Sequence, residues 1–396
     1  LHVVRATKQV EEQNRTPWNP KRIFEQRWAN PALRGLYRAR RAWADAHYTP
    51  EKRSVSVGTH WMDSNLESAL LHLAEGRPEN VRRAVEMLEV VIAQQDTDPK
   101  SPAYGAIKRV LEWEKALHGA SSLFDYMLAE VFILFREKLP DEVSAGIKRA
   151  LTLKMEGLRK SKSGYLFGTS DVYRGTNEML SELAGVMLTA EIHGDSELSQ
   201  KAYKRFRSYV QWNLTEGFHL EHNSGNYTAV NMRPTATIAN YSENPGARLA
   251  ARMFLERFWM DMTGRYHPAI RQVAGPHTRA YMRPMVTGDW SNTTALIHQE
   301  LAPELPGWLL PRRLNSTGLV DFYSPLYLAE LAIHKSLPFK LNGTCFALYG
   351  PPSAVPAYLG HRYALGSRAV PNRSTGNTSP SETSFNLYYA RKMPPR

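Results

Sequence analysis

Apolar residues recur at spacings of three and four along most of the chain. Between Val81 and Ile92, for example, Val81, Val85, Leu88 and Val91 fall on one face of a helix. Short turns that contain Gly or Pro separate such stretches. This pattern predicts amphipathic helices over residues 31–48, 62–75, 79–95, 102–118, 121–137, 141–158, 174–193, 196–213, 246–263 and 324–336.

Many helices joined by short turns pack as antiparallel pairs, in a solenoid, a bundle array or an α/α toroid. No fixed repeat period occurs, which disfavours a regular solenoid. We therefore predict an all-α fold, an (α/α)n toroid or barrel of antiparallel helix pairs, over residues 1–340. Residues 344–349 and 385–390 read as short strands. We expect residues 341–396 to form an irregular, β-containing C-terminal segment packed on the toroid.

The composition narrows the possible partners. The chain has 396 residues, 42% of them hydrophobic, and no apolar run long enough to span a membrane. A single cysteine excludes an internal disulfide framework and a cysteine-based zinc site. The net charge of +12 favours an anionic partner, and the Lys and Arg residues are scattered, which favours an acidic polysaccharide over nucleic acid.

Several sequence motifs for other kinds of chemistry are absent. The chain has no Gly-X-Gly-X-X-Gly element, no P-loop, no His-Glu-X-X-His and no Gly-X-Ser-X-Gly. These absences disfavour dinucleotide chemistry, phosphoryl transfer and hydrolases with a nucleophile elbow. We expect neither a cofactor nor a metal ion.

Nine Asn-X-Ser/Thr sequons occur, a strong excess for a protein that is never glycosylated. We therefore expect a secreted, extracellular protein. One of these sequons begins at Asn226, inside a candidate site, and is expected to remain unmodified. N-linked glycans are expected on some of Asn14, Asn213, Asn240, Asn292, Asn315, Asn342, Asn372 and Asn377.

Two segments between the predicted helices are dense in ionisable side chains. The second, residues 274–281, carries His277, Arg279 and Tyr281 at alternate positions, so an extended chain would direct all three to one side. Arg279 beside Tyr281 would favour the phenolate, which lets Tyr281 act as a base. The alternative is that Tyr281 is a core aromatic residue and Arg279 a surface charge.

The first segment, residues 218–227, contains Glu221, His222, Asn223 and Tyr227. Such groups suit β-elimination of a uronic acid polymer, in which a base takes the proton beside a carboxylate and an acid protonates the leaving oxygen. Glu221, helped by Asn223 or Arg279, would manage the substrate carboxylate. His222 or His277 would assist proton transfer, and Tyr227 would contact substrate. Alternatively, Glu221 is a solvated or paired carboxylate and His222 a structural histidine.

Other residues are weaker candidates for substrate binding. Tyr173, Arg174 and Asn177 lie at the predicted start of a helix and could line the cleft, although Asn177 could equally be a helix cap. Trp61 and Trp290 could stack on sugar rings, although most Trp residues in a helical protein are in the core.

The two dense segments resemble elements of a known family. Residues 221–227, Glu-His-Asn-Ser-Gly-Asn-Tyr, resemble a Glu-X-Asn-Ser-Pro-X-Tyr element, and residues 274–281 resemble an Ala-Gly-Pro-His-Ser-Arg-Ala-Tyr element. Together they are similar to α/α-barrel polysaccharide lyases, most nearly polysaccharide lyase family 38, which acts on alginate and glucuronan. The resemblance implies that Tyr281 transfers the proton, that Glu221 faces the substrate carboxylate, and that His277 and Arg279 support them. Gly225 stands where the family pattern has Pro.

These observations predict a secreted lyase that cleaves a 1,4-linked uronate polymer, either glucuronan or an alginate-like chain. One alternative is an inverting glycoside hydrolase on the same scaffold, which needs two carboxylates, such as Glu221 with Asp171 or Glu178. Another is a protein that binds acidic glycans without catalysis.

Overall fold

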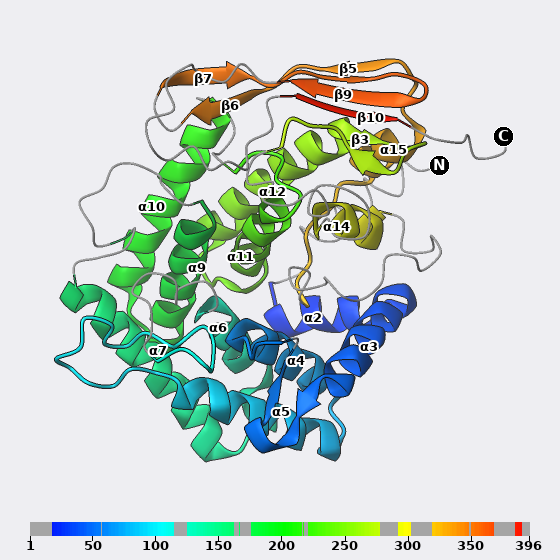
Figure 1. Cartoon of the computed structure of the whole chain (residues 1–396). Helices are drawn as coiled ribbons and strands as arrows, with labels where there is room; N and C mark the ends of the chain where they lie inside the picture. Colours follow the sequence, from blue (N-terminus) through cyan, green and yellow to red (C-terminus); the bar gives the residue numbers. More distant parts are fainter. Residues whose placement is uncertain are drawn as a thin grey trace.

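The computed structural model describes residues 18–56, 58–114, 125–161, 166, 176–215, 217, 221–277, 292–301, 319–347, 350–367 and 385–389. Helices dominate this part of the chain (Figure 1). They are α2 (Pro20–Ala29), α3 (Pro31–Ala46), α4 (Met62–Glu75), α5 (Pro78–Ala93), α6 (Asp125–Phe135), α7 (Asp141–Ser161), α9 (Thr176–His193), α10 (Ser196–Thr215), α11 (Tyr227–Tyr241), α12 (Pro245–Arg265), α14 (Asn292–Leu301) and α15 (Leu326–His334). The predicted helical fold class is confirmed.

The helices form two layers. Four inner helices, α4, α6, α9 and α11, contact one another in that order, and each packs against the outer helix that follows it, α5, α7, α10 or α12. In α9, every residue from Met179 to Ala190 is buried. In α10, by contrast, buried Leu198, Ala202, Phe206 and Val210 mark a single apolar face. Helices of the two layers therefore differ in how much of their circumference is covered.

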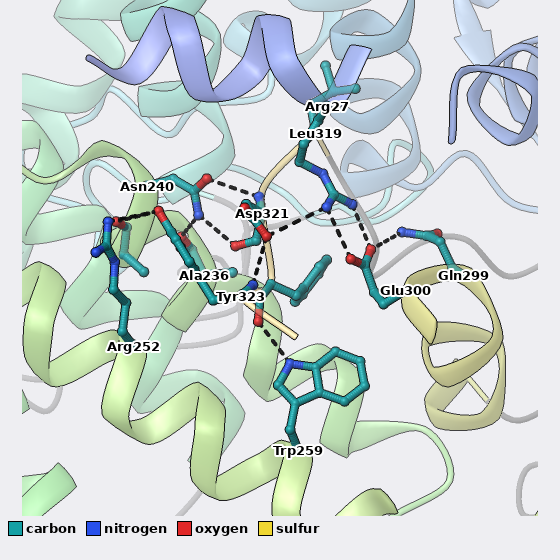
Figure 2. Close-up of polar contacts among 12 residues, drawn as sticks. Arg27, Ala236, Asn240, Arg252, Trp259, Gln299, Glu300, Leu319, Asp321 and Tyr323 are labelled. Atoms are coloured by element: carbon teal, nitrogen blue, oxygen red, sulfur yellow. Dashed lines mark hydrogen bonds and ion pairs between the residues drawn. The ribbon is translucent and has the colours of Figure 1, made fainter. Parts of the chain in front are cut away.

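Polar contacts close the ring of inner helices (Figure 2). Helix α11 contacts α14, and Arg27 of α2 pairs with Glu300 of α14 at 2.6 Å between Nη2 and Oε1. The same guanidinium lies 3.8 Å from Asp321, whose backbone N–H donates to Asn240 of α11 at 2.9 Å. Helix α2 contacts α3, which in turn contacts α4.

Helix α11 was not predicted, because it carries no apolar stripe. Its buried residues include Thr228, Asn231, Arg233, Thr235 and Thr237. The two last hydroxyls donate to backbone carbonyls one turn earlier in the same helix, at 2.9 and 3.0 Å. A helix packed on all sides by other helices needs no polar face, so its sequence loses the period of 3.6. Helices α2 and α14 were also missed.

The predicted helix over residues 102–118 is wrong in its described part. Residues 101–114 form turns and isolated bridges, and Gly105 has a left-handed φ of +79°. A Cβ atom at Gly105 would lie 2.1 Å from the carbonyl oxygen of Leu153 in α7. The side-chain amide of Gln95 donates to Gly105 O at 2.9 Å and to Ala150 O at 2.7 Å, which ties the turn to α7. Residues 115–118 lie outside the described residues.

The C-terminal region carries antiparallel sheets, at the upper edge of Figure 1. The predicted strands at 344–349 and 385–390 correspond to β6 and β10, whereas the others were not predicted. The division of the chain near residue 340 stays a prediction. The four-stranded sheet has the order β10-β9-β8-β5 and β6 pairs with β7: β5 (Phe339–Leu341), β6 (Thr344–Ala347), β7 (Gly350–Ala354), β8 (Ala357–Leu359), β9 (Tyr363–Ser367) and β10 (Phe385–Tyr389).

Short two-stranded ladders join the helices elsewhere. They are β1 (Tyr48–Thr49) with β2 (Ser54–Val55), and β3 (Tyr266–His267) with β4 (Gln272–Val273). The second ladder follows α12 directly and leads into the second dense segment.

The structure also bears on the expected glycans. Asn213 and Asn240 are buried, and their amides donate to backbone carbonyls at 2.9 Å from Tyr209 O and 2.8 Å from Asp321 O. A glycan on either amide is incompatible with this fold, so these two positions leave the expected set. Asn342 is exposed. None of the helices described here is long and apolar enough to cross a membrane.

Candidate active site

The described parts of the two dense segments, residues 221–227 and 274–277, lie against each other, and Asn223 joins them. Its φ is +51°, a left-handed conformation that Asn tolerates better than most residues. Its amide nitrogen donates to Ala274 O at 2.7 Å and to Pro276 O at 2.9 Å. In return, His277 Nδ1 lies 2.7 Å from Asn223 O. Both amide hydrogens of Asn223 therefore act within the protein, as a clamp on the second segment.

His277 is buried, with a relative exposure of 2%. Burial lowers the pKa of His277 to about 4, because the charged imidazolium would lose its hydration. The ring is therefore neutral near pH 7. Its Nδ1 must carry the proton that is donated to Asn223 O, so the lone pair is on Nε2. The ring also contacts Tyr388 of β10 edge-on, with centroids 6.0 Å apart.

His222 is paired with a carboxylate that the sequence analysis missed. Its Nε2 lies 3.0 Å from Asp261 Oδ2, and both residues are buried. Burial alone would raise the pKa of Asp261, but the charges of His222 and Arg265 and a hydrogen bond from His222 lower it well below its usual range. Asp261 is therefore an ionised partner of His222.

Arg265, one turn after Asp261 in α12, completes this group. Its Nε donates to Asp261 Oδ1 at 3.1 Å, its Nη1 to Gly275 O at 3.1 Å and its Nη2 to Val355 O at 2.6 Å. One fully buried guanidinium thus connects α12, the second dense segment and the C-terminal region.

Glu221 contacts the N-terminus of the inner helix α9. Its Oε2 accepts hydrogen bonds from the backbone N–H of Asn177 at 3.1 Å and from Asn231 Nδ2 at 3.0 Å. The residue is 2% exposed, so Glu221 is not a solvated surface carboxylate. Asn177 is buried beside it as the second residue of α9. The dipole of α9 also stabilises a negative carboxylate at this N-terminus.

Tyr227 is half-buried as the first residue of α11, where its backbone N–H donates to Ser224 Oγ at 3.0 Å. Thr293 of α14 donates to Ser224 O at 2.8 Å, so α11 and α14 both hold this turn. Trp61 is half-exposed before α4, where its described contacts include the guanidinium of Arg109, 4.9 Å from the ring centroid, and the indole of Trp113. The contacts described for Trp61 do not link it to the clamp.

The remaining candidates lie outside the described residues: Tyr281, Arg279, Trp290, Tyr173 and Arg174. Their positions stay predictions. Within the described ranges, no group of three His, Cys, Asp or Glu side chains is placed to hold a metal ion.

The sequence held a faint signal for the residues that were missed. Asp261 and Arg265 are charged residues four apart in a helix that buries Phe258, Trp259 and Met262 beside them. A charged pair at this spacing within a buried stretch indicates a paired site. Tyr388 offered no such signal, because it approaches His277 from a point 111 residues further along the chain (388 minus 277).

The chain is similar to one family model and to several solved structures. A family model described as a domain of unknown function, DUF8769, matches residues 124–301, a range that includes both dense segments. No curated protein matches the chain. A solved structure of chondroitinase AC lyase, whose active site was studied in complexes with oligosaccharides, is similar with 11% sequence identity and a TM-score of 0.48. The match covers 89% of this chain and 50% of that one, so the chain spans about half the length of that lyase.

Proposed function

We propose that this protein is a secreted polysaccharide lyase that cleaves a 1,4-linked uronic acid polymer, glucuronan or an alginate-like chain, by β-elimination. The observation that carries the proposal is the clamp at Asn223. It brings together the two segments whose residues resemble those of polysaccharide lyases, and it holds neutral His277 against the segment of Glu221 and His222.

The reaction needs a base, an acid and a group that offsets the substrate carboxylate. The base removes the proton from the carbon beside the carboxylate, a carbon–carbon double bond forms, the bond to the 4-linked oxygen breaks, and an acid protonates that oxygen. We assign the proton transfers to Tyr281, four residues after His277. The lone pair on His277 Nε2 lets this ring accept a hydrogen bond from Tyr281 or the substrate.

Glu221 and Arg279 are assigned to the substrate carboxylate. The structure supports a fixed position for Glu221, because two N–H groups hold its Oε2. Contact with the substrate carboxylate is not assigned to Asn223, because both of its amide hydrogens already donate to backbone carbonyls. We assign Asn223 to holding the two segments together.

The test is a screen of glucuronan, alginate and related polymers, read by ultraviolet absorbance and product mass. A lyase yields an absorbing unsaturated uronate whose mass is one water less than that of a hydrolysis product. No change in absorbance or mass with any of these polymers would refute the proposal. New reducing ends without the absorbing product would indicate a hydrolase, and salt-sensitive binding of an unchanged polymer would indicate a glycan-binding protein.

Two variants test the assigned roles on an accepted polymer. Tyr281→Phe deletes only the hydroxyl and is expected to lower turnover by roughly 10²-fold or more. Glu221→Gln is expected to lower turnover strongly with a modest loss of binding, because the amide can donate a hydrogen bond but cannot pass a proton. Tyr327→Phe is the matched control for the loss of a tyrosine hydroxyl. Tyr327 is an exposed residue of α15, and its hydroxyl donates a hydrogen bond to Glu256 of α12.

A further inference from the structure

Asp261 occupies a position at which three parts of the site meet. It lies in the last turns of α12, yet its two oxygens serve different partners. Oδ2 contacts His222 Nε2 at 3.0 Å in the first dense segment, and Oδ1 accepts from Arg265 Nε at 3.1 Å. An Asn at this position could accept from Arg265, but it would have to donate to His222 instead of accepting from it.

The contact to His222 determines where that imidazole carries its proton. An ionised carboxylate accepts hydrogen bonds and donates none, so His222 Nε2 must be protonated. When the ring is neutral, its lone pair is then on Nδ1. His277 has the opposite arrangement, with the proton on Nδ1 and the lone pair on Nε2. The two histidines therefore present different nitrogen atoms as bases.

Arg265 couples this pair to the clamp. From Asp261 it reaches Gly275 O, and the next residue, Pro276, is held by the amide of Asn223. Asn223 follows His222 directly in the chain. This chain of contacts begins and ends at neighbouring residues, His222 and Asn223. It therefore fixes the imidazole of His222 relative to the second dense segment.

We propose that Asp261 is a positioning residue that holds His222 with its proton on Nε2, so that Nδ1 is the basic atom that His222 contributes to the site. Its catalytic consequence rests on the proposed lyase function, whereas the position of the proton does not. Among the described residues, the charged and titratable groups that act on this pair include Arg265 and Arg257 of α12 and the nearby His277.

The first experiment needs no substrate. In protein labelled with ¹⁵N-histidine, the His222 resonances are identified by their loss in His222→Gln, and nitrogen shifts are followed from acid to alkaline pH. The expected result is a protonated Nε2 and, where the ring is neutral, an unprotonated Nδ1. A neutral His222 with its proton on Nδ1 in the unmodified protein would overturn the inference, whatever the protein's activity proves to be.

The second experiment alters the carboxylate. Asp261→Asn should let protonation move toward Nδ1, and Asp261→Glu, which keeps the charge, should restore Nε2 protonation at least in part. On a polymer that the protein cleaves, Asp261→Asn should lower turnover tenfold or more with a smaller change in KM, and should shift the pH profile. An unchanged His222 tautomer in a folded Asp261→Asn protein would contradict the proposal.

Glu300→Gln is the matched control. It removes the charge of another buried carboxylate that pairs with an arginine, but at the contact between α2 and α14. It should lower the melting temperature and leave the His222 resonances in place. If Glu300→Gln moves these resonances as far as Asp261→Asn does, the effect is a general loss of stability and the positioning role is wrong.

Discussion

The candidate site depends on side chains that are polar and yet buried. Asn223, His222 and His277 each expose 2% or less of their surface, and each is held by hydrogen bonds to backbone carbonyls or to a carboxylate. A buried polar group is costly unless it is paired, so such a cluster persists only where its partners are fixed. At the scale of the residue, the site is therefore rigid and sensitive to the charge state of its histidines.

Acid should destabilise the protein partly through His277. Its pKa in the folded protein, about 4, lies below the ordinary value of 6.5, so the unfolded chain binds more protons between these values. The stability from neutral His277 is fully present above about pH 6.5 and is lost as the pH falls toward 4. A tenfold difference in proton affinity is worth about 1.4 kcal/mol, so the loss is on the order of 3 kcal/mol.

Urea unfolding of the native protein and of His277→Gln between pH 7 and pH 4 measures this effect. The variant should show a weaker decline of unfolding free energy with acid, although its stability at pH 7 is lower. Exposed His361→Gln provides the control. Equal pH dependence in His277→Gln and the native protein would mean that other buried groups, such as His298, dominate acid sensitivity.

At the scale of the element, apolar periodicity identified the outer helices, which each cover a single face, and also the inner helices α4, α6 and α9. It failed at α11, where buried Asn231 and Arg233 pair with Glu221 and Glu130 and break the period. It misled at residues 102–114, where helix-like spacing occurs in a segment that Gly105 bends against α7. The local sequence pattern shows which residues are apolar, but it does not show which distant residues will bury a polar side chain.

The contact between strand β9 and the second dense segment predicts a specific defect. A Cβ atom at Gly366 would lie 1.7 Å from Gly275 O, so Gly366→Ala must displace β9 or the segment that Asn223 clamps. We expect a loss of roughly 1–3 kcal/mol, as for other overpacked sites, together with lower activity. Thermal unfolding measures the first effect and the polymer assay the second.

Gly35→Ala is the matched control within α3. Nothing lies within 4 Å of the Cβ that it would add, so it should stabilise the helix by about 0.5–1 kcal/mol. A Gly366→Ala protein that melts and acts like the native one would show that the sheet does not support the site.

At the scale of the whole molecule, the sequence revealed the two segments of the site but not how they are held. Segments whose contacts join residues 51 to 54 positions apart were recognised separately by their chemistry, since each carries its own ionisable groups. Asp261, Val355 and Tyr388 support them through contacts that only the folded chain brings about. The net charge of +12 can also be read from the sequence, and it acts over distances larger than any one contact.

This charge should make capture of a polyanionic substrate dependent on salt. At physiological ionic strength, screening limits the reach of exposed charges to about 8 Å, so higher salt weakens long-range attraction more than contacts inside the site. Rising salt should therefore raise KM for long uronate polymers more than it changes kcat. Arg279→Ala should weaken both, because a charge beside the substrate carboxylate acts in the ground state and more strongly in the transition state.

Kinetics on one defined polymer at low and high salt test this prediction, with Arg22→Ala as the control because Arg22 is exposed on α2. Arg22→Ala should change KM slightly and leave kcat alone, as expected of one surface charge among many. A KM that does not change with salt, together with a fully active Arg279→Ala protein, would mean that the basic residues are solvated surface charges without a role in substrate capture. The carboxylate would then have to be recognised by neutral donors, and the role assigned to Arg279 would be wrong.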